Sequence, residues 1–225
     1  MNRSVKRNFA ATASAAMCAL LLVGCATTAS IPPTEPQTEV PYSANDTVAA
    51  FRGLTYDYDP LRSPDELAKL SKIVVSGIVA QVQAGRTTKF PGNDEAKGST
   101  SIVLVLANAK VITGELDAGG DGIVYIELPN PGRPDSAYYN KAFPTGASVA
   151  AYLVPAPDGL PTEGIDVAIE DPNAGRPQGQ PLYMTANPQG LAIQFGAEDI
   201  VWPLIGAQKP GRISETLPGG ELIAE

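Results

Sequence analysis

The sequence contains no histidine, and its only two cysteines lie at positions 18 and 25. Without an imidazole base, a serine or cysteine nucleophile cannot be activated as it is in hydrolases that use histidine. The same absence removes the nitrogen and sulfur ligands of zinc, iron and copper sites. Carboxylate acid-base chemistry and oxygen-ligand sites for calcium or magnesium remain open.

Basic residues are also scarce. The chain has 16 Lys and Arg against 24 Asp and Glu, a formal charge of −8. Residues 1–25 hold three basic and no acidic residues, so the chain without them carries about −11. An acidic protein is repelled by phosphate backbones and by anionic lipid surfaces. We therefore expect no nucleic-acid partner.

The N-terminus has the order of a secretory signal. Basic residues at positions 3, 6 and 7 precede an apolar run over residues 9–23, and the small Gly24 stands before Cys25. The run is shorter than the roughly 20 residues that a membrane-spanning helix needs. An ordinary secretory signal that happens to contain a cysteine is the alternative interpretation.

The stretch Leu-Leu-Val-Gly-Cys, residues 21–25, resembles the lipobox of bacterial lipoproteins. The resemblance implies that residues 1–24 are a signal peptide and that the Cys25 thiol is acylated. Two or three acyl chains hold a protein stably on a bilayer. We therefore expect a chain that is lipid-anchored at the extracytoplasmic face of the cell membrane, with the lipid bilayer as its partner through Cys25.

Residues 25–46 follow with prolines at 32, 33, 36 and 41 and no apolar periodicity. This composition favours an extended, disordered stalk. With Cys18 in the signal and Cys25 acylated, no disulfide supports the domain beyond the stalk. Residues 47–205 must fold by burying a core.

Residues 63–66, Ser-Pro-Asp-Glu, predict a short helix with a capping box. Residues 72–83 then predict a β-strand, and Gly77 within it indicates a bulge or sharp bend. Residues 99–113 predict a central strand covered on both faces, and residues 123–128 and 148–154 predict two more. Between these two, residues 136–143 are compatible with one or two helical turns.

The C-terminal part is less regular. Residues 165–169 suggest a short edge strand, and residues 182–195 suggest a hairpin around a turn at 187–190. Residues 200–204 predict a last short strand. Residues 206–225 hold several glycines and prolines, and we expect them to form a flexible tail.

The predicted elements give a mainly β domain with one or two short helices. Their order is similar to that of the five-stranded Greek-key barrel of the OB-fold and of netrin-like domains. Residues 72–83, 99–113 and 148–154 carry the resemblance. A small β-sandwich is the alternative. Some OB-fold domains bind oligonucleotides or oligosaccharides, but a fold does not determine a function.

Two loop regions contain the aromatic residues that ligand sites often use: Tyr56 and Tyr58, and Tyr138 and Tyr139. Aromatic faces stack on sugar rings, and neighbouring carboxylates accept hydrogen bonds from hydroxyl groups. The alternative is that these rings cap the ends of the barrel with their hydroxyl groups in water.

Two acidic groups have weaker chemical interpretations. Asp117 and Asp121 lie on a glycine-rich loop that could hold calcium, but a plain hairpin turn explains the same residues. Asp166, Glu170 and Asp171 could supply the acid and base of a glycoside hydrolase, but a charge-rich solvated loop is the better account of them. We expect no cofactor and no metal.

The sequence therefore predicts a lipid-anchored module that binds rather than catalyses. Its expected partner is an envelope protein or a cell-wall glycan. The alternatives are a dedicated carbohydrate-binding or cell-wall-binding domain and, less favoured, a carboxylate-based hydrolase.

Overall fold

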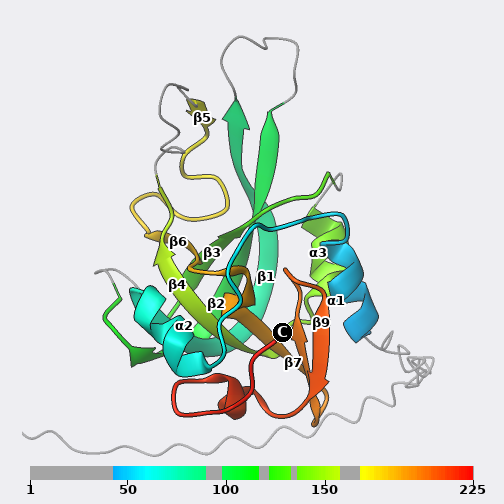
Figure 1. Ribbon diagram of the computed structural model, residues 1–225. Helices are drawn as coiled ribbons and strands as arrows, with labels where there is room; N and C mark the ends of the chain where they lie inside the picture. Colours follow the sequence, from blue (N-terminus) through cyan, green and yellow to red (C-terminus); the bar gives the residue numbers. More distant parts are fainter. Residues whose placement is uncertain (1–42, 90–97, 117–121, 133–135, 158–167, 225) are drawn as a thin grey trace, which may run out of the picture. The chain divides into compact units, whose positions relative to one another are not determined.

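The computed structural model describes residues 43–89, 98–116, 122–132, 136–157 and 168–224 (Figure 1). The described helices are α1 (Ala44–Ala50), α2 (Pro64–Leu70) and α3 (Ser136–Ala142), with 3-10 turns η1 (Pro188–Gly190) and η2 (Ile213–Thr216). The described strands are β1 (Ile73–Lys89), β2 (Ser99–Thr113), β3 (Val124–Leu128), β4 (Ser148–Pro155), β5 (Ala168–Glu170), β6 (Leu182–Thr185), β7 (Leu191–Phe195), β8 (Asp199–Trp202) and β9 (Ala207–Pro210).

Five of these strands form a closed ring in the order β1, β2, β3, β6, β4 and back to β1. All neighbours in the ring are antiparallel except β3 and β6, which run parallel. The mainly β class and the five-stranded barrel are thus confirmed. The described residues hold three α-helices, one more than the largest number predicted.

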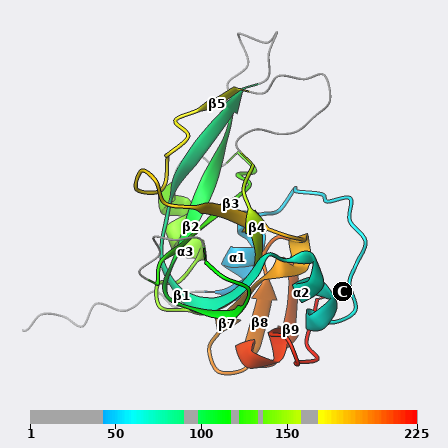
Figure 2. The same cartoon turned by 90° about the vertical axis from the view of Figure 1, so that its left-hand side faces the viewer.

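The sheet continues beyond the ring at two places. β5 pairs with the far end of β1, on an arm that β1 and β2 extend away from the barrel (Figures 1 and 2). β7, β8 and β9 form a meander that starts from β4.

β1 bends so that one strand serves both sides of the barrel. Its first six residues, 73–78, pair with β4, while residues 74–88 pair with β2. The register with β2 shifts between Ser76 and Ile78, at Gly77. A Cβ atom on Gly77 would lie 3.1 Å from the Ala107 carbonyl oxygen, a tight contact that favours glycine at this close approach. The predicted bend is confirmed.

The barrel interior is filled by alternate side chains of each strand, as the two-residue period requires. From β2, Ile102, Leu104 and Leu106 lie in the main core, whereas Val103 and Val105 belong to a smaller cluster on the other face. The two-sided burial expected for residues 99–113 holds only in this middle section. Val111 and Ile112 are 40% and 42% exposed, because β3 pairs with β2 only along residues 102–106.

The predicted hairpin over residues 182–195 is wrong. β6 and β7 do not pair with each other, and both pair with β4, β6 along residues 153–155 and β7 along residues 149–151. Between them the Asn187 side chain accepts a hydrogen bond from the Gln189 N–H at 2.9 Å and begins the 3-10 turn η1. The Asn-Pro pair therefore interrupts one continuing strand and does not reverse it.

The C-terminal residues that we expected to form a flexible tail are packed. Residues 207–210 form β9, and Ile223 and Ala224 are buried. The Gln189 side chain donates a hydrogen bond to the Ala224 carbonyl oxygen at 2.5 Å, and Lys209 Nζ donates to the Ile223 carbonyl oxygen at 3.0 Å. Apolar side chains and these two hydrogen bonds hold the segment in place, although its Gly- and Pro-rich composition had predicted a flexible tail.

The helix starts follow local capping rules. Ser63 caps α2 as predicted, with its Oγ accepting from the Glu66 N–H at 3.2 Å. The Glu66 carboxylate, however, accepts from the Arg62 N–H at 2.8 Å, one residue earlier than a standard capping box. Ser43 caps α1, so the last residues of the expected stalk are helical. Residues 25–42 lie outside the described residues.

Among the residues that the structure describes, no helix has the length and apolar character needed to cross a membrane.

Candidate functional site

Tyr56 and Tyr58 line a hollow of about 330 Å³ that we call the tyrosine hollow. Its walls come from α1, from residues 52–58 and from the connection between β8 and β9. Its lining includes Phe51, Arg52, Tyr56, Tyr58, Pro203 and Ile205. The first pair of tyrosines predicted from the sequence is thus brought into one cavity.

The floor of the tyrosine hollow is held in place by the core. Phe51 is buried, and its ring lies 5.8 Å from Phe143 in an edge-to-face arrangement. The Thr47 hydroxyl donates a short hydrogen bond to the Ala142 carbonyl oxygen, which fixes α1 on α3. On the opposite wall, Gly206 adopts a left-handed φ of +69° that lets the chain turn from β8 into β9. Both walls are therefore part of the folded framework.

Tyr56 has an unusual polar environment. Its hydroxyl oxygen is buried and has no hydrogen-bond partner among the residues that the structure describes. Burial raises the pKa of Tyr56 to about 12, so the hydroxyl stays protonated and acts as a donor at neutral pH. Buried polar groups are normally hydrogen-bonded, so this hydroxyl is an exception that calls for an explanation.

The second predicted pair, Tyr138 and Tyr139, does not line this hollow. Tyr139 is fully buried in the main core, and its hydroxyl donates to Asn130 Oδ1 at 2.8 Å. Tyr138 packs edge-to-face on Tyr139 with ring centroids 5.4 Å apart. For Tyr139 the interpretation as a ligand contact is therefore wrong, because α3 turns this ring inward.

A second hollow, of about 450 Å³, lies on the outer face of β1, β2 and β3, and we call it the barrel-face hollow. Its lining includes Gln81, Gln83, Val105, Tyr125, Arg176 and Pro177. We did not single out these residues from the sequence. The alternation of side chains in β2 and β3 places Val105 and Tyr125 on the face opposite Leu104 and Ile126. This alternation was the sequence signal from which the lining of the hollow could have been found.

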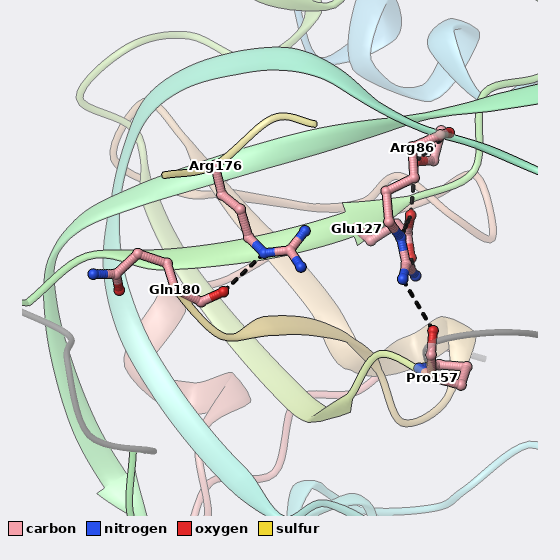
Figure 3. Close-up of polar contacts among 6 residues, drawn as sticks. Arg86, Glu127, Pro157, Arg176 and Gln180 are labelled. Carbon is pink, nitrogen blue, oxygen red and sulfur yellow. Dashed lines mark hydrogen bonds and ion pairs between the residues drawn. The ribbon is translucent and has the colours of Figure 1, made fainter. Parts of the chain in front are cut away.

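Residues 171–180 form one wall of the barrel-face hollow. Arg176 Nε donates to the Gln180 carbonyl oxygen at 2.8 Å, which closes the loop on itself (Figure 3). Gly175 packs directly on the sheet: a Cβ atom there would lie 2.5 Å from Val103 Cγ2 and 2.9 Å from the Ala84 carbonyl oxygen. The loop is therefore seated on β1 and β2.

A buried ion pair stands on the same three strands (Figure 3). Arg86 on β1 binds Glu127 on β3 through two hydrogen bonds, Nε to Oε1 at 2.9 Å and Nη2 to Oε2 at 2.5 Å. Ser101 on β2, between them, donates to Glu127 Oε1 at 2.8 Å. Arg86 Nη1 also donates to the Pro157 carbonyl oxygen at 3.1 Å, so the pair links β1, β3 and the segment after β4.

The acidic residues do not form a described catalytic pair. Glu170 makes an exposed ion pair with Lys89 at 2.6 Å, and Asp171 is exposed in a turn with a positive φ of 51°. Asp166, Asp117, Asp121 and Cys25 lie outside the described residues. Within the described ranges, no group of three or more Asp, Glu, His or Cys side chains is placed to hold a metal ion.

No family model, no curated protein and no solved structure matches this chain.

Proposed function

We propose that this protein is a non-catalytic binding module, tethered by lipid at Cys25 to the extracytoplasmic face of the cell membrane. The observation that carries the proposal is the barrel-face hollow. It places two amide side chains, Gln81 and Gln83, beside the Tyr125 ring and the Arg176 loop. Ligand sites typically combine apolar and aromatic walls with a few polar groups, and this lining contains both kinds of side chain.

The chemistry of this lining favours a cell-wall glycan. A glutamine amide offers two donors and one acceptor, and a sugar hydroxyl can accept and donate in the same way. An aromatic ring provides a flat apolar surface for the face of a sugar. With a formal charge of −8, the chain gains little from an anionic polymer such as nucleic acid.

The topology supports the same proposal. A five-stranded ring with β3 parallel to β6 and α3 between β3 and β4 is the arrangement that we associate with the OB-fold. We propose that the domain belongs with OB-like barrels, some of which bind oligosaccharides on a strand face. The alternative partner, an envelope protein, would use the same face and its exposed Ile123.

The hydrolase alternative gains no support from the described residues. Glu170 makes an exposed ion pair with Lys89 and Asp171 is exposed in a turn, so neither carboxylate lies in an enclosed cleft.

The first test is co-sedimentation of the full-length protein with purified cell wall. The proposal expects sedimentation that falls at least severalfold in the double variant Gln81→Ala and Gln83→Ala. The control is Gln178→Ala, which removes an exposed amide on the loop 171–180 that does not line the hollow. Equal sedimentation of the wild type and the double variant would contradict the glycan site.

The second test is in-cell crosslinking of the protein and of its Cys25→Ala variant, followed by mass spectrometry. A single envelope protein captured only by the anchored form would replace the glycan with a protein partner. Identical products from both forms would argue against anchoring at Cys25.

A further inference from the structure

Exposed aliphatic side chains gather where α2 and β2 end. Among the residues that the structure describes, five large apolar side chains are exposed, and three of them are Leu70 (54%), Val111 (40%) and Ile112 (42%). Leu70 is the last residue of α2, and the other two lie close to the end of β2. Apolar side chains that are exposed as a group mark contact sites for proteins or membranes, whereas single ones need no explanation.

The fold brings these two ends together although they are distant in the sequence. α2 leads almost directly into β1, whose residue Val74 pairs with Thr113 of β2 (Figure 1). Two residues after Leu70, the Lys72 carbonyl oxygen packs so closely on Gly114 that it leaves no room for a Cβ atom there. The end of α2 and the end of β2 therefore lie side by side.

A bulge in β2 explains why two consecutive residues are exposed. The register with β1 moves from Val111 opposite Val75 to Thr113 opposite Val74, so Ile112 is an extra residue in β2. Bulges re-aim the side chains around them. Val111 and Ile112 are therefore both exposed, although a regular strand would place them on opposite faces of the sheet.

Lysine side chains stand next to these aliphatic residues. Lys69 precedes Leu70 and Lys110 precedes Val111, and both lysines are exposed. A lysine lays its methylene stem along apolar surface and keeps its ammonium group in a polar layer. Aliphatic side chains accompanied by lysines are typical of surfaces that lie in the headgroup layer of a bilayer. We call residues 69, 70, 110, 111 and 112 the basic-apolar patch.

The negative charge of the chain does not prevent such a contact. Screening limits electrostatic effects to about 8 Å at physiological ionic strength, so the charges next to the patch matter most. Asp65 and Glu66, at the start of α2, use their carboxylates to accept hydrogen bonds from the Gly219 and Arg62 N–H groups. Glu115 follows the end of β2, and the two lysines of the patch outnumber it.

The lipid anchor proposed at Cys25 makes even a weak patch effective, and this step rests on that proposal. Residues 25–42 can span up to about 55 Å at about 3.1 Å per residue, whereas a domain of this size has a radius of gyration of about 16 Å. Such a tether lets any side of the domain reach the bilayer. It also holds the patch at an effective concentration on the order of millimolar, so a contact too weak to recruit a free protein still orients a tethered one.

We propose that the basic-apolar patch docks on the phospholipid bilayer to which the chain is anchored. Leu70, Val111 and Ile112 enter the headgroup layer, and Lys69 and Lys110 contact lipid phosphates. The patch thus determines which side of the domain faces the membrane.

The test places a fluorescent dye on the full-length, lipid-anchored protein in vesicles of phosphatidylethanolamine and phosphatidylglycerol. Ile112→Cys carries the dye within the patch, and Gln178→Cys carries it at an exposed position of the loop 171–180 as the matched control. A phospholipid with a nitroxide on its acyl chain quenches the dye only at short range. We expect this lipid to quench the dye severalfold more strongly at position 112 than at position 178.

Two double variants test the chemistry of the patch. Lys69→Gln with Lys110→Gln removes the charges, and Leu70→Gln with Val111→Gln removes apolar surface; each should reduce the quenching at position 112 severalfold. All four side chains are exposed, so neither variant should lower the thermal midpoint. Lys141→Gln is the control, because Lys141 is exposed on α3, outside the patch, and its removal should leave the quenching unchanged.

Flotation of the same vesicles separates this proposal from the anchor on which it rests. Protein that does not float with the vesicles would overturn the anchor and this inference with it. Protein that floats but shows equal quenching at positions 112 and 178 would overturn the patch and leave the anchor standing. A dye at position 112 that is shielded from iodide in water, yet not quenched by the nitroxide lipid, would show that protein covers the patch and would also overturn the proposal.

Discussion

Two tyrosines of this domain differ in how their hydroxyl groups are hydrogen-bonded. Burial raises the pKa of both Tyr56 and Tyr152 above the ordinary value of about 10. The Tyr152 hydroxyl donates to the Thr216 carbonyl oxygen at 2.7 Å, whereas the Tyr56 hydroxyl has no partner within the described part of the chain. One hydroxyl therefore stabilises the fold through a hydrogen bond, and the other makes no such contribution.

The pH dependence of stability follows from these shifts. A raised pKa means that the folded state holds the phenol proton more tightly than the unfolded state does. The free energy of unfolding should be insensitive to these groups below pH 10 and should fall as the pH rises from 10 toward 12. Denaturant titrations at several pH values should show a shallower fall in Tyr56→Phe and in Tyr152→Phe.

The free energy of unfolding at neutral pH distinguishes the two variants. Tyr152→Phe should lower the free energy of unfolding by about 1 kcal/mol, the typical contribution of a hydrogen bond, while Tyr56→Phe should leave it unchanged. A steeper alkaline fall in either variant would contradict the assignment of the raised pKa values.

Gly175 is the residue that seats the loop 171–180 on the sheet. Gly175→Ala would introduce a Cβ atom 2.5 Å from Val103 Cγ2 at a φ of +78°, so it combines a clash with backbone strain. We expect a loss of about 1–3 kcal/mol, as for other overpacked positions, together with weaker binding at the barrel-face hollow. Thermal denaturation and cell-wall sedimentation measure the two effects.

Gly179→Ala is the control for strain alone. Gly179 has a similar φ of +81°, but no atom lies within 4 Å of the position of its Cβ atom. Gly179→Ala should lower the free energy of unfolding less than Gly175→Ala does, and it should leave binding at the barrel-face hollow unchanged. Equal losses would mean that the contact with Val103 does not matter.

At the level of elements, the Arg86–Glu127 pair joins the first and third strands of the ring across the second. Arg86→Met would leave the Glu127 carboxylate in a mostly buried position without its counter-charge. Breaking a buried pair in this way typically costs about 3–5 kcal/mol. Chemical denaturation should detect the loss.

The double variant Arg86→Met with Glu127→Met distinguishes charge from packing. Replacing both partners by apolar side chains of similar size is often neutral. We therefore expect the double variant to recover most of the loss of Arg86→Met. A double variant that is less stable than the single one would show that the pair itself, with its contacts to Ser101 and Pro157, is indispensable.

Gln189 in η1 joins three segments that are distant in the sequence. Its side chain accepts from the Leu61 N–H at 2.8 Å and donates to the Leu61 and Ala224 carbonyl oxygens. Gln189→Leu should leave these buried groups unpaired and cost about 2 kcal/mol or more. It should also speed proteolysis near residue 223, measured by mass spectrometry, whereas Gln208→Leu on the exposed edge of β9 should not.

The elements that the sequence predicted well are those set by local rules. The Ser63 cap and the Gly77 bend follow from neighbouring residues, and both are found. The hairpin over 182–195 failed because the choice of β4 as partner depends on distant strands. Local patterns carry no information on such pairings.

The same reasoning explains the mixed outcome for the candidate sites. Tyr56 and Tyr58 are close in sequence, and they share a hollow. Whether Tyr139 faces solvent depends on how α3 docks on Phe51, which the sequence does not state. The barrel-face hollow combines three strands with a loop some 50 residues later, so it becomes visible only in the folded chain.

For the whole molecule, the proposed anchor makes a direct prediction. Cys25→Ser removes the thiol that acylation needs, so the protein should move from the membrane fraction to the soluble extracytoplasmic fraction. Cell fractionation with immunoblotting measures the shift. The control is Cys18→Ser, because Cys18 lies within the predicted signal and is not the proposed acylation site. An unchanged membrane fraction for Cys25→Ser would contradict the anchor.

The closed ring also constrains when this chain can fold. β3 and β4 are joined through β6, which begins only at Leu182, more than 100 residues after β1 starts at Ile73. Pairings between such distant residues form slowly, and here the final pairing must wait until that residue has been synthesised. A nascent chain therefore stays open through most of its production, which is the state in which a polypeptide can still be threaded through a narrow pore.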